Sequence, residues 1–150
     1  MRAPFNVLVI PYRRTAADTL FAVFQRADDA AWQFIAGGGE DAETPLAAAR
    51  REAHEEAGIA TDAPLLPLEA RSPVPRSALA GHAHWPADLT AIPEHCFAVE
   101  LATPTLQLSA EHTHAAWLDH AAALQRLRYA SNRLALNELA ARLHCAAPSG

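Results

Sequence analysis

The chain has 150 residues, of which 51% are hydrophobic and 19% charged, and this balance excludes a disordered chain and predicts one globular domain over residues 1–150. Its formal net charge of -5 argues against binding to duplex nucleic acid, because proteins that bind duplexes carry a basic surface. No apolar run is long enough to cross a bilayer and the N-terminus lacks the apolar stretch of a secretion signal, so we expect a cytoplasmic protein without membrane contact.

Strands are expected first in the chain. The runs from Phe5 to Tyr12 and from Thr19 to Gln25 are rich in β-branched and aromatic residues, which favour extended backbone. The pattern resumes briefly over 32–35. Consecutive glycines at 37–39 follow, and they predict a loop whose backbone can approach a ligand closely, because glycine carries no side chain.

A helix is expected next, from Pro45 to Ala57, because both of its ends carry favourable residues. Thr44 is a good N-cap, and Pro45 suits the first helical position, where its missing N–H costs nothing. Gly58 can adopt the left-handed conformation that ends many helices. The glycine run therefore leads into a helix with defined ends.

The second half of the chain shows weaker patterns. Its expected elements are a strand at 65–70, an irregular insertion at 72–93, a strand at 96–101, a short strand or turn at 111–118 and a helix at 133–143. The insertion is rich in proline, alanine and histidine and shows no sustained period. Ser131 and Asn132 are expected to cap the last helix.

Three glutamates on the helix at 45–57 carry the first functional signal. Glu52, Glu55 and Glu56 stand three and four residues apart, so they share one face of the helix, where like charges repel. Magnesium binds through one or two carboxylates while substrate phosphates complete its shell, whereas zinc prefers histidine or cysteine. The spacing therefore predicts an exposed magnesium site, with a merely solvated acidic face as the alternative.

The wider pattern around these glutamates resembles the box of the Nudix hydrolases. Gly37, five residues, Glu43, seven residues and then the run REAHEEAGI at 51–59 fit each fixed position of that box. Two positions depart from the usual residues: Ala53 is smaller than the usual aliphatic residue, and Ala42 stands where a glycine is common.

The resemblance implies an α/β (α+β) fold in which a mixed β-sheet is sandwiched between helices. It implies a loop-helix-loop that binds Mg²⁺, or Mn²⁺ in its place, and hydrolysis of a nucleoside diphosphate linked to another group. In the family, the residues that match Glu52, Glu55 and Glu56 bind metal, and one of them is sometimes the general base. The residues that match Glu43 and Arg51 brace the loop.

Residues outside the box resemble those of the bacterial dihydroneopterin triphosphate pyrophosphatases, a group also described as dATP pyrophosphohydrolases. The similar runs are 25–29, 32–33, 111–112, 117–119 and 131–133. In that group the residue that matches Glu111 is a further metal ligand or base. The insertion at 72–93 departs from the pattern, which leaves the identity of the substrate open.

The candidates for binding substrate are Arg26, Trp32, Gly37 and Arg133. Arg26 could hold phosphates with two donors, or it could pair with Asp28 or Asp29 at the surface. Trp32 could stack on a pterin or purine ring. Near Gly37 a backbone carbonyl, its own or that of Ala36, is the further metal ligand that the resemblance implies.

The favoured hypothesis is a magnesium-dependent Nudix pyrophosphohydrolase, which takes a small nucleoside or pterin triphosphate and releases pyrophosphate. A second hypothesis is a dinucleoside polyphosphate or RNA 5' end pyrophosphohydrolase, since the run Trp32-Gln33-Phe34 also occurs in that group. A third is a noncatalytic, ligand-sensing Nudix module, although the complete box disfavours it. The oligomeric state and the identity of the base stay open.

Overall fold

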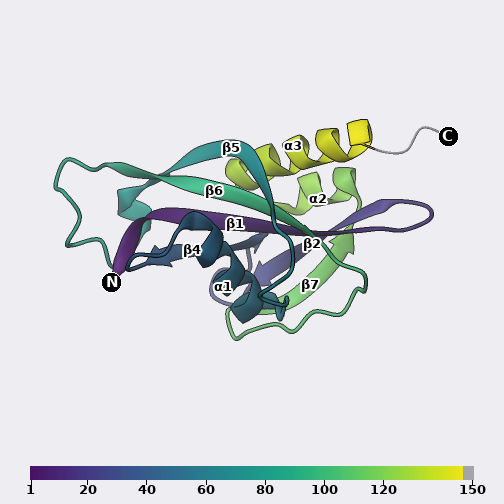
Figure 1. Ribbon diagram of the computed structural model, residues 1–150, viewed down its shortest axis with the longest axis horizontal. Coiled ribbons are helices and arrows are strands. Elements are labelled where there is room, and N and C mark those ends of the chain that lie inside the picture. Colours follow the sequence, from purple (N-terminus) through teal and green to yellow (C-terminus); the bar gives the residue numbers. More distant parts are fainter. Residues whose placement is uncertain (147–150) are drawn as a thin grey trace.

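The computed structural model describes residues 1–146 of the chain (Figure 1). The elements in chain order are β1 (Arg2–Arg14), β2 (Thr19–Arg26), β3 (Trp32–Gln33), β4 (Ile35–Glu40), α1 (Pro45–Ala57), β5 (Leu66–Pro75), a 3-10 turn (Arg76–Ala78), β6 (Ala91–Glu100), β7 (His112–Leu118), α2 (His120–Arg126) and α3 (Ala130–Ala146). No described helix is both long and apolar enough to cross a membrane.

A seven-stranded mixed sheet organises the fold around β1. Its main order is β3-β2-β1-β6-β5, with β4 paired to β1 and β7 paired to β2. Among the described strands, the pairing of β1 with β6 is parallel and the other pairings are antiparallel. Because β1 pairs with β4 over its first half and with β2 at its end, the sheet forks along this strand.

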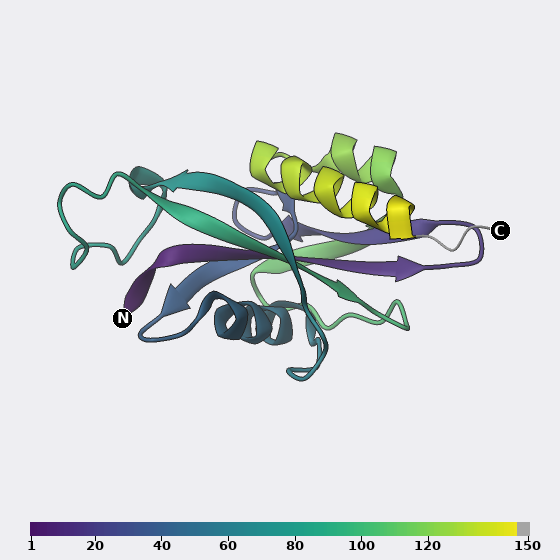
Figure 2. The same cartoon turned by 45° about the horizontal axis from the view of Figure 1, so that its top comes forward.

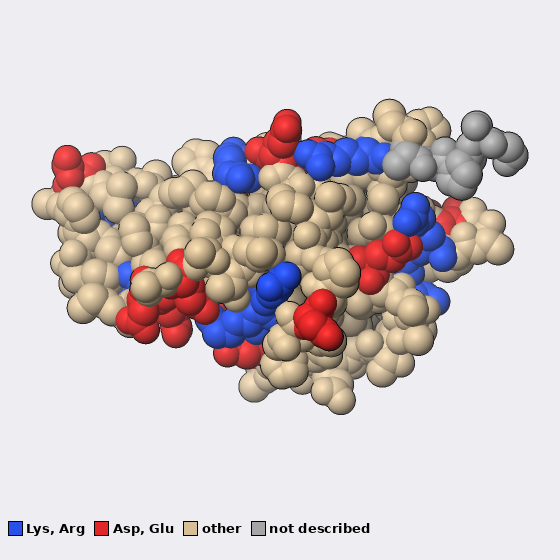
Figure 3. Space-filling view, in the orientation of Figure 1, with Lys and Arg blue, Asp and Glu red and all other residues tan. Residues whose placement is uncertain are grey.

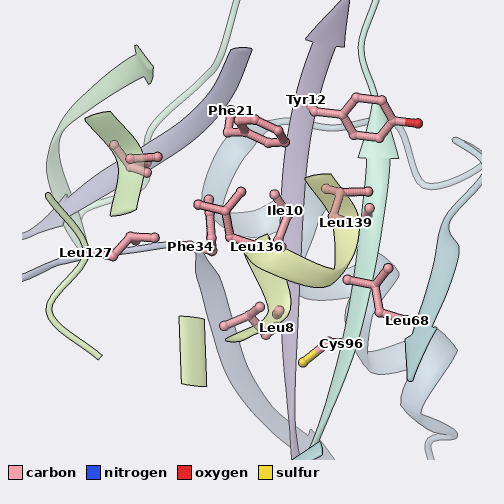
Figure 4. Close-up of a cluster of buried hydrophobic side chains, with 14 residues drawn as sticks. Leu8, Ile10, Tyr12, Phe21, Phe34, Leu68, Cys96, Leu127, Leu136 and Leu139 are labelled. Atoms are coloured by element: carbon pink, nitrogen blue, oxygen red, sulfur yellow. The ribbon is translucent and has the colours of Figure 1, made fainter. Parts of the chain in front are cut away.

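The two faces of the sheet bury separate hydrophobic clusters, since alternate residues of a strand point to opposite faces. On β1, Leu8 and Ile10 belong to a cluster that α2 and α3 cover (Figure 4). Val7 and Val9 belong to the cluster beneath α1. Figure 2 shows α1 on one side of the sheet and the other two helices on the opposite side. The expected fold, a mixed sheet between helices, is thus confirmed.

The glycines at 37–39 form strand β4, so the prediction of a loop there is wrong. Gly37 and Gly38 pair with Val7 and Asn6 of β1. A Cβ atom at Gly38 would lie 2.1 Å from the Arg2 guanidinium, and one at Gly39 would lie 2.1 Å from the Phe5 ring. The glycines therefore make room for side chains of β1 rather than form a turn.

The insertion expected at 72–93 is irregular only in its middle. Strand β5 continues to Pro75 and β6 begins at Ala91, and the two pair through Pro73 and Pro93. The prolines of β5 fit because this strand lies at the edge of the sheet, and Pro93 fits because it comes just before the part of β6 that pairs with β1. The segment 79–90 between them is held near β1, since the Trp85 indole N–H donates to the Arg2 carbonyl at 2.9 Å.

Helix α2 was not among the expected elements. It spans only seven residues, yet Asp119 caps it by accepting a hydrogen bond from the Ala122 N–H at 2.8 Å. The last helix, α3, begins at Ala130, before the expected start at 133. Asn132 is buried in its first turn, and its side-chain oxygen accepts a hydrogen bond from the Phe34 N–H at 2.8 Å. This contact ties the start of α3 to the β3–β4 junction.

Candidate active site

The glutamates are carried by α1, whose ends and packing follow from its sequence. Thr44 accepts a hydrogen bond from the Ala47 N–H at 3.1 Å, and Gly58 ends the helix with φ at 71°. The expected bounds, Pro45 to Ala57, are confirmed. Ala53 is buried against the sheet with 1% of its surface exposed, so the small residue that departs from the box lies at the closely packed face of the helix.

Arg51 joins the loop before α1 to the acidic face of the helix. Its guanidinium donates to both carboxylate oxygens of Glu43 at 2.9 Å and to the Gly38 carbonyl at 2.9 Å. The same group donates to Glu52 at 2.9 Å and to Glu55 at 3.3 Å. These contacts are those of a residue that braces the loop, and they supply positive charge beside two of the glutamates.

Glu56 is buried, so the expectation of an exposed acidic site is wrong for this residue. Only 1% of its surface is exposed, and neither carboxylate oxygen has a hydrogen-bond partner. Burial, and then the nearby carboxylates of Glu52 and Glu111, raise the pKa of Glu56 far above the ordinary value. By contrast, the Glu55 side chain is 55% exposed. The three helix glutamates therefore lie in different environments despite their shared arc.

His112, on β7, is the nearest candidate for a compensating charge. Its Nδ1 lies 3.8 Å from Oε1 of Glu56, and both side chains are buried. Burial, together with the charge of Arg26, lowers the pKa of His112, so its ring is neutral at neutral pH. A neutral imidazole leaves the Glu56 carboxylate without a compensating cation.

A cavity of about 370 Å³ opens beside these carboxylates. Glu52, Glu111 and Arg2 contribute to its lining, with the glycines of β4. A Cβ at Gly37 would lie 2.3 Å from the Glu52 carboxyl carbon, so the absence of a side chain there gives that carboxylate its place. Burial, and then the negative charge of Glu52, raise the pKa of Glu111 above its ordinary value.

The donor set fits a hard divalent cation. Carboxylate oxygens are the ligands that Mg²⁺ and Mn²⁺ prefer, and such a cation would give the buried oxygens of Glu56 the partner they lack and favour the ionised form of this residue. Arg51 draws the carboxylates of Glu52 and Glu55 toward itself. Within residues 1–146, no group of three or more acidic, histidine or cysteine side chains has the geometry to coordinate a metal ion.

A second cavity, of about 380 Å³, lies next to the first. The two share Arg2 and residues 36–38 as a common wall. The further lining of the second cavity comes from β1, β2, β3, β5, β6 and the start of α3, and it includes Asn6, Arg26, Gln33, Pro75, Glu94, Tyr129 and Ser131. An acidic cavity and a mixed polar and apolar cavity thus adjoin at the glycines of β4.

Of the four predicted substrate-binding residues, Gly37 and Arg26 line these cavities. Arg26 also forms the surface ion pair that was the alternative, since its guanidinium donates two hydrogen bonds to Asp28, at 2.8 and 2.5 Å. Trp32 lies outside both linings: it packs on the core, with the Arg126 guanidinium 4.8 Å from its ring centroid.

Arg133 also lies outside both cavities. Its guanidinium donates to the carbonyls of Leu127 and Arg128, at 2.8 and 2.9 Å, and so holds the turn between α2 and α3. Sequence reasoning missed Arg2 and Glu94. For Glu94 a signal existed, since it is an acid in a largely apolar strand, whereas nothing near Arg2 in the sequence marks it. On the face of the molecule in Figure 3, acidic and basic side chains are interspersed and form no broad basic surface.

Comparisons with known proteins give a consistent family. The NUDIX domain matches residues 3–139. A Listeria monocytogenes protein described as a NUDIX hydrolase is 37% identical, with a TM-score of 0.86 over 95% of this chain and 96% of that one. The E. coli dihydroneopterin triphosphate pyrophosphohydrolase is 26% identical, with a TM-score of 0.76 over 94% and 97%.

A C. elegans Ap4A hydrolase shares the fold at 23% identity, with a TM-score of 0.74 over 95% of this chain and 99% of that one. Curated protein sequences gave no match. The NUDIX match extends over most of the chain, and it includes the glycine strand, the helix α1 and the carboxylates described above. The chain therefore belongs to the NUDIX domain family and is an enzyme of the Nudix hydrolase class.

Proposed function

We propose that the protein is a magnesium-dependent pyrophosphohydrolase that cleaves a nucleoside or pterin triphosphate to a monophosphate and pyrophosphate. The observation that carries the proposal is the pair of adjoining cavities. One holds the carboxylates of Glu52 and Glu111, and the other is lined by polar and apolar groups that suit a heterocyclic ring. A substrate with phosphates at one end and a ring at the other matches this division.

The metal ligands are assigned to two carboxylates that line the acidic cavity, Glu52 and Glu111, and to Glu55 and Glu56 on the same helix face as Glu52. Together they would hold Mg²⁺, or Mn²⁺ in its place, which neutralises phosphate oxygens and acidifies an attacking water. Any of these glutamates that stays free of the metal can act as the base, provided that its oxygen lies within about 2.6–3.2 Å of that water. Arg51 is anchored by its contacts with Glu43 and Gly38, and from there it holds the side chains of Glu52 and Glu55 in place.

Arginines at the common wall are assigned to the phosphates. Arg2 lines both cavities and Arg26 lines the second, so a polyphosphate that crosses between them would meet both guanidiniums. Gly37 and Gly38 leave the wall without side chains, which gives the phosphates access to the Glu52 carboxylate. These residues bind and orient the substrate, while the glutamates carry the chemistry.

A substrate panel tests the proposal. It comprises dihydroneopterin triphosphate, the four deoxynucleoside triphosphates, diadenosine polyphosphates, ADP-ribose and triphosphorylated RNA, each with and without Mg²⁺. Phosphorus NMR should show a monophosphate and pyrophosphate from a triphosphate, and only with the metal present. Diphosphate and orthophosphate as the main products, or turnover of diadenosine polyphosphates alone, would contradict the proposal.

A further inference from the structure

Glu94, on β6, is a buried carboxylate for which the fold supplies too few partners. Only 5% of its surface is exposed, and its Oε1 atom has no hydrogen-bond partner. Burial raises the pKa of Glu94 to about 7, with the Ser131 hydroxyl as an opposing influence. An unpartnered acid at such a position destabilises the free protein, and a bound ligand that donates a hydrogen bond would remove this cost.

The surroundings of Glu94 indicate what it would bind. It lies in the second cavity, in register with Asn6 of the neighbouring parallel strand β1. Two side-chain amides that line the same cavity are already engaged: the Asn6 oxygen accepts from Arg2, and the Asn132 oxygen accepts from the Phe34 N–H. Glu94 therefore offers free acceptor capacity at a place where the apolar surfaces of Pro75 and Tyr129 also line the cavity.

We propose that Glu94 selects the ring of the substrate by accepting hydrogen bonds from two adjacent N–H groups, as a guanine or a pterin presents them. These rings carry an exocyclic amino group beside a ring N–H, and one carboxylate can accept from both donors. Adenine presents an amino donor beside a ring acceptor, so an ionised carboxylate would satisfy one group and repel the other. The inference rests on the proposed function, and it narrows the substrate class from any purine or pterin to rings of the guanine and pterin kind.

The test compares kcat/KM for four triphosphates in the wild type, in Glu94→Gln and in the control Glu69→Gln. The substrates are dGTP, dihydroneopterin triphosphate, dATP and dITP, which lacks the exocyclic amino group of dGTP. Glu69 is an exposed acid on the neighbouring strand β5, so its change to glutamine controls for loss of one negative charge.

Glu94→Gln should lower kcat/KM for dGTP and for the pterin by about tenfold to a hundredfold, as expected when a buried N–H of the ring loses its hydrogen-bond acceptor. It should leave dATP unchanged or improve it, because the glutamine amide offers the donor and acceptor that adenine requires. The effect on dITP should be smaller than that on dGTP. Equal losses for dGTP and dATP, or no loss for dGTP, would overturn the inference.

Binding without turnover keeps the two proposals separate. Isothermal titration with dGMP, dAMP and neopterin, in the absence of metal, reports on ring recognition alone. Tighter binding of dGMP and neopterin than of dAMP, lost in Glu94→Gln, supports the role of Glu94 even if no triphosphate is hydrolysed. Equal binding of dGMP and dAMP to the wild type rejects it, even if triphosphates are hydrolysed. Thermal melting verifies that each variant is folded.

Discussion

Glu56 and Glu94 are two buried acids that the fold leaves short of partners, one on α1 and the other on β6. Buried carboxylates are rarely tolerated without a hydrogen bond or a cation, because removal from water disfavours the charged form. Glu56 lies beside other carboxylates, which indicates a cation, whereas Glu94 lies in a cavity of mixed polar and apolar lining, which suits a neutral ring that carries N–H donors. The same local defect therefore points to two different ligands.

Changing Glu56 to glutamine should abolish most activity without unfolding the protein. Because burial and neighbouring carboxylates favour the neutral form of Glu56, the neutral amide imitates its state in the metal-free protein. We expect a loss of about a hundredfold or more in kcat/KM, as for the loss of a charged group at a reaction centre.

Melting temperature with and without Mg²⁺ distinguishes this role from a structural one. The wild type should gain stability from Mg²⁺ by mass action, and Glu56→Gln should gain much less. Without the metal, the melting temperature of the variant should equal or exceed that of the wild type. Full turnover by the folded variant at saturating Mg²⁺ would remove Glu56 from the metal site.

Stability should fall with rising pH on account of Glu94. Its folded pKa is about 7, above the ordinary 4.5, so the folded state binds a proton more tightly than the unfolded state does. The contribution to stability is complete below pH 4.5 and is lost as the pH rises through 7, by on the order of 3 kcal/mol. The adjacent Cys96 thiol has its pKa raised by burial to about 12, so it does not titrate in this range.

Urea unfolding at pH 5 and pH 8 measures this effect as the difference between the wild type and Glu94→Gln. Arg2 and Arg26, which line the same cavity, stay protonated at both values and cancel in the comparison. The wild type should lose more stability than the variant between the two values. An equal pH dependence of the two proteins would show that Glu94 is as well solvated as a surface acid.

Among the elements, those with strong local signals were predicted and those fixed by tertiary contacts were not. Helix α1 has a capping threonine, a proline at its first position and a glycine at its end, and its bounds were predicted correctly. Strand β4 consists largely of glycine, which has no side chain to indicate pairing, and its extended backbone is fixed by β1. Helix α2 is short, and only its Asp119 cap could have indicated it.

Alanine substitutions at two glycines of β4 should affect substrate binding and the chemical step differently. Neither Gly37 nor Gly38 has a left-handed backbone, so alanine fits the strand, and the new methyl group meets only the end of a flexible side chain. At Gly38 that end is the Arg2 guanidinium, and at Gly37 it is the Glu52 carboxylate. Gly38→Ala should therefore raise KM with a smaller change in kcat, and Gly37→Ala should mainly lower kcat.

Steady-state kinetics with the preferred triphosphate checks both variants, and melting temperatures within a few degrees of the wild type show that the strand is intact. A raised KM alone for Gly37→Ala would mean that Glu52 contributes to binding rather than to the reaction. An unchanged KM for Gly38→Ala would show that Arg2 does not touch the substrate.

At the scale of the whole molecule, the fold and the acidic half of the site could be predicted from the sequence, whereas the second cavity could not. The residues of the Nudix box are close in sequence, so they meet through strand β4, the turn after it and helix α1. Arg2, Glu94 and Ser131 come from distant parts of the chain and meet only through the parallel pairing of β1 with β6 and the docking of α3. No local sequence pattern predicts that these three residues lie in one cavity.

The arrangement of the two cavities also predicts which phosphorus is attacked. With the ring in the cavity of Glu94, the α-phosphate lies nearest the common wall, which residues 36–38 form and which Glu52 adjoins on the acidic side. Water positioned by the carboxylates should then attack the α-phosphorus, and pyrophosphate should leave in line. Hydrolysis in oxygen-18 water, followed by mass spectrometry of both products, should place the label in the monophosphate. Label in pyrophosphate would mean attack at the β-phosphorus. The β-phosphate, and not the α-phosphate, would then lie at the common wall.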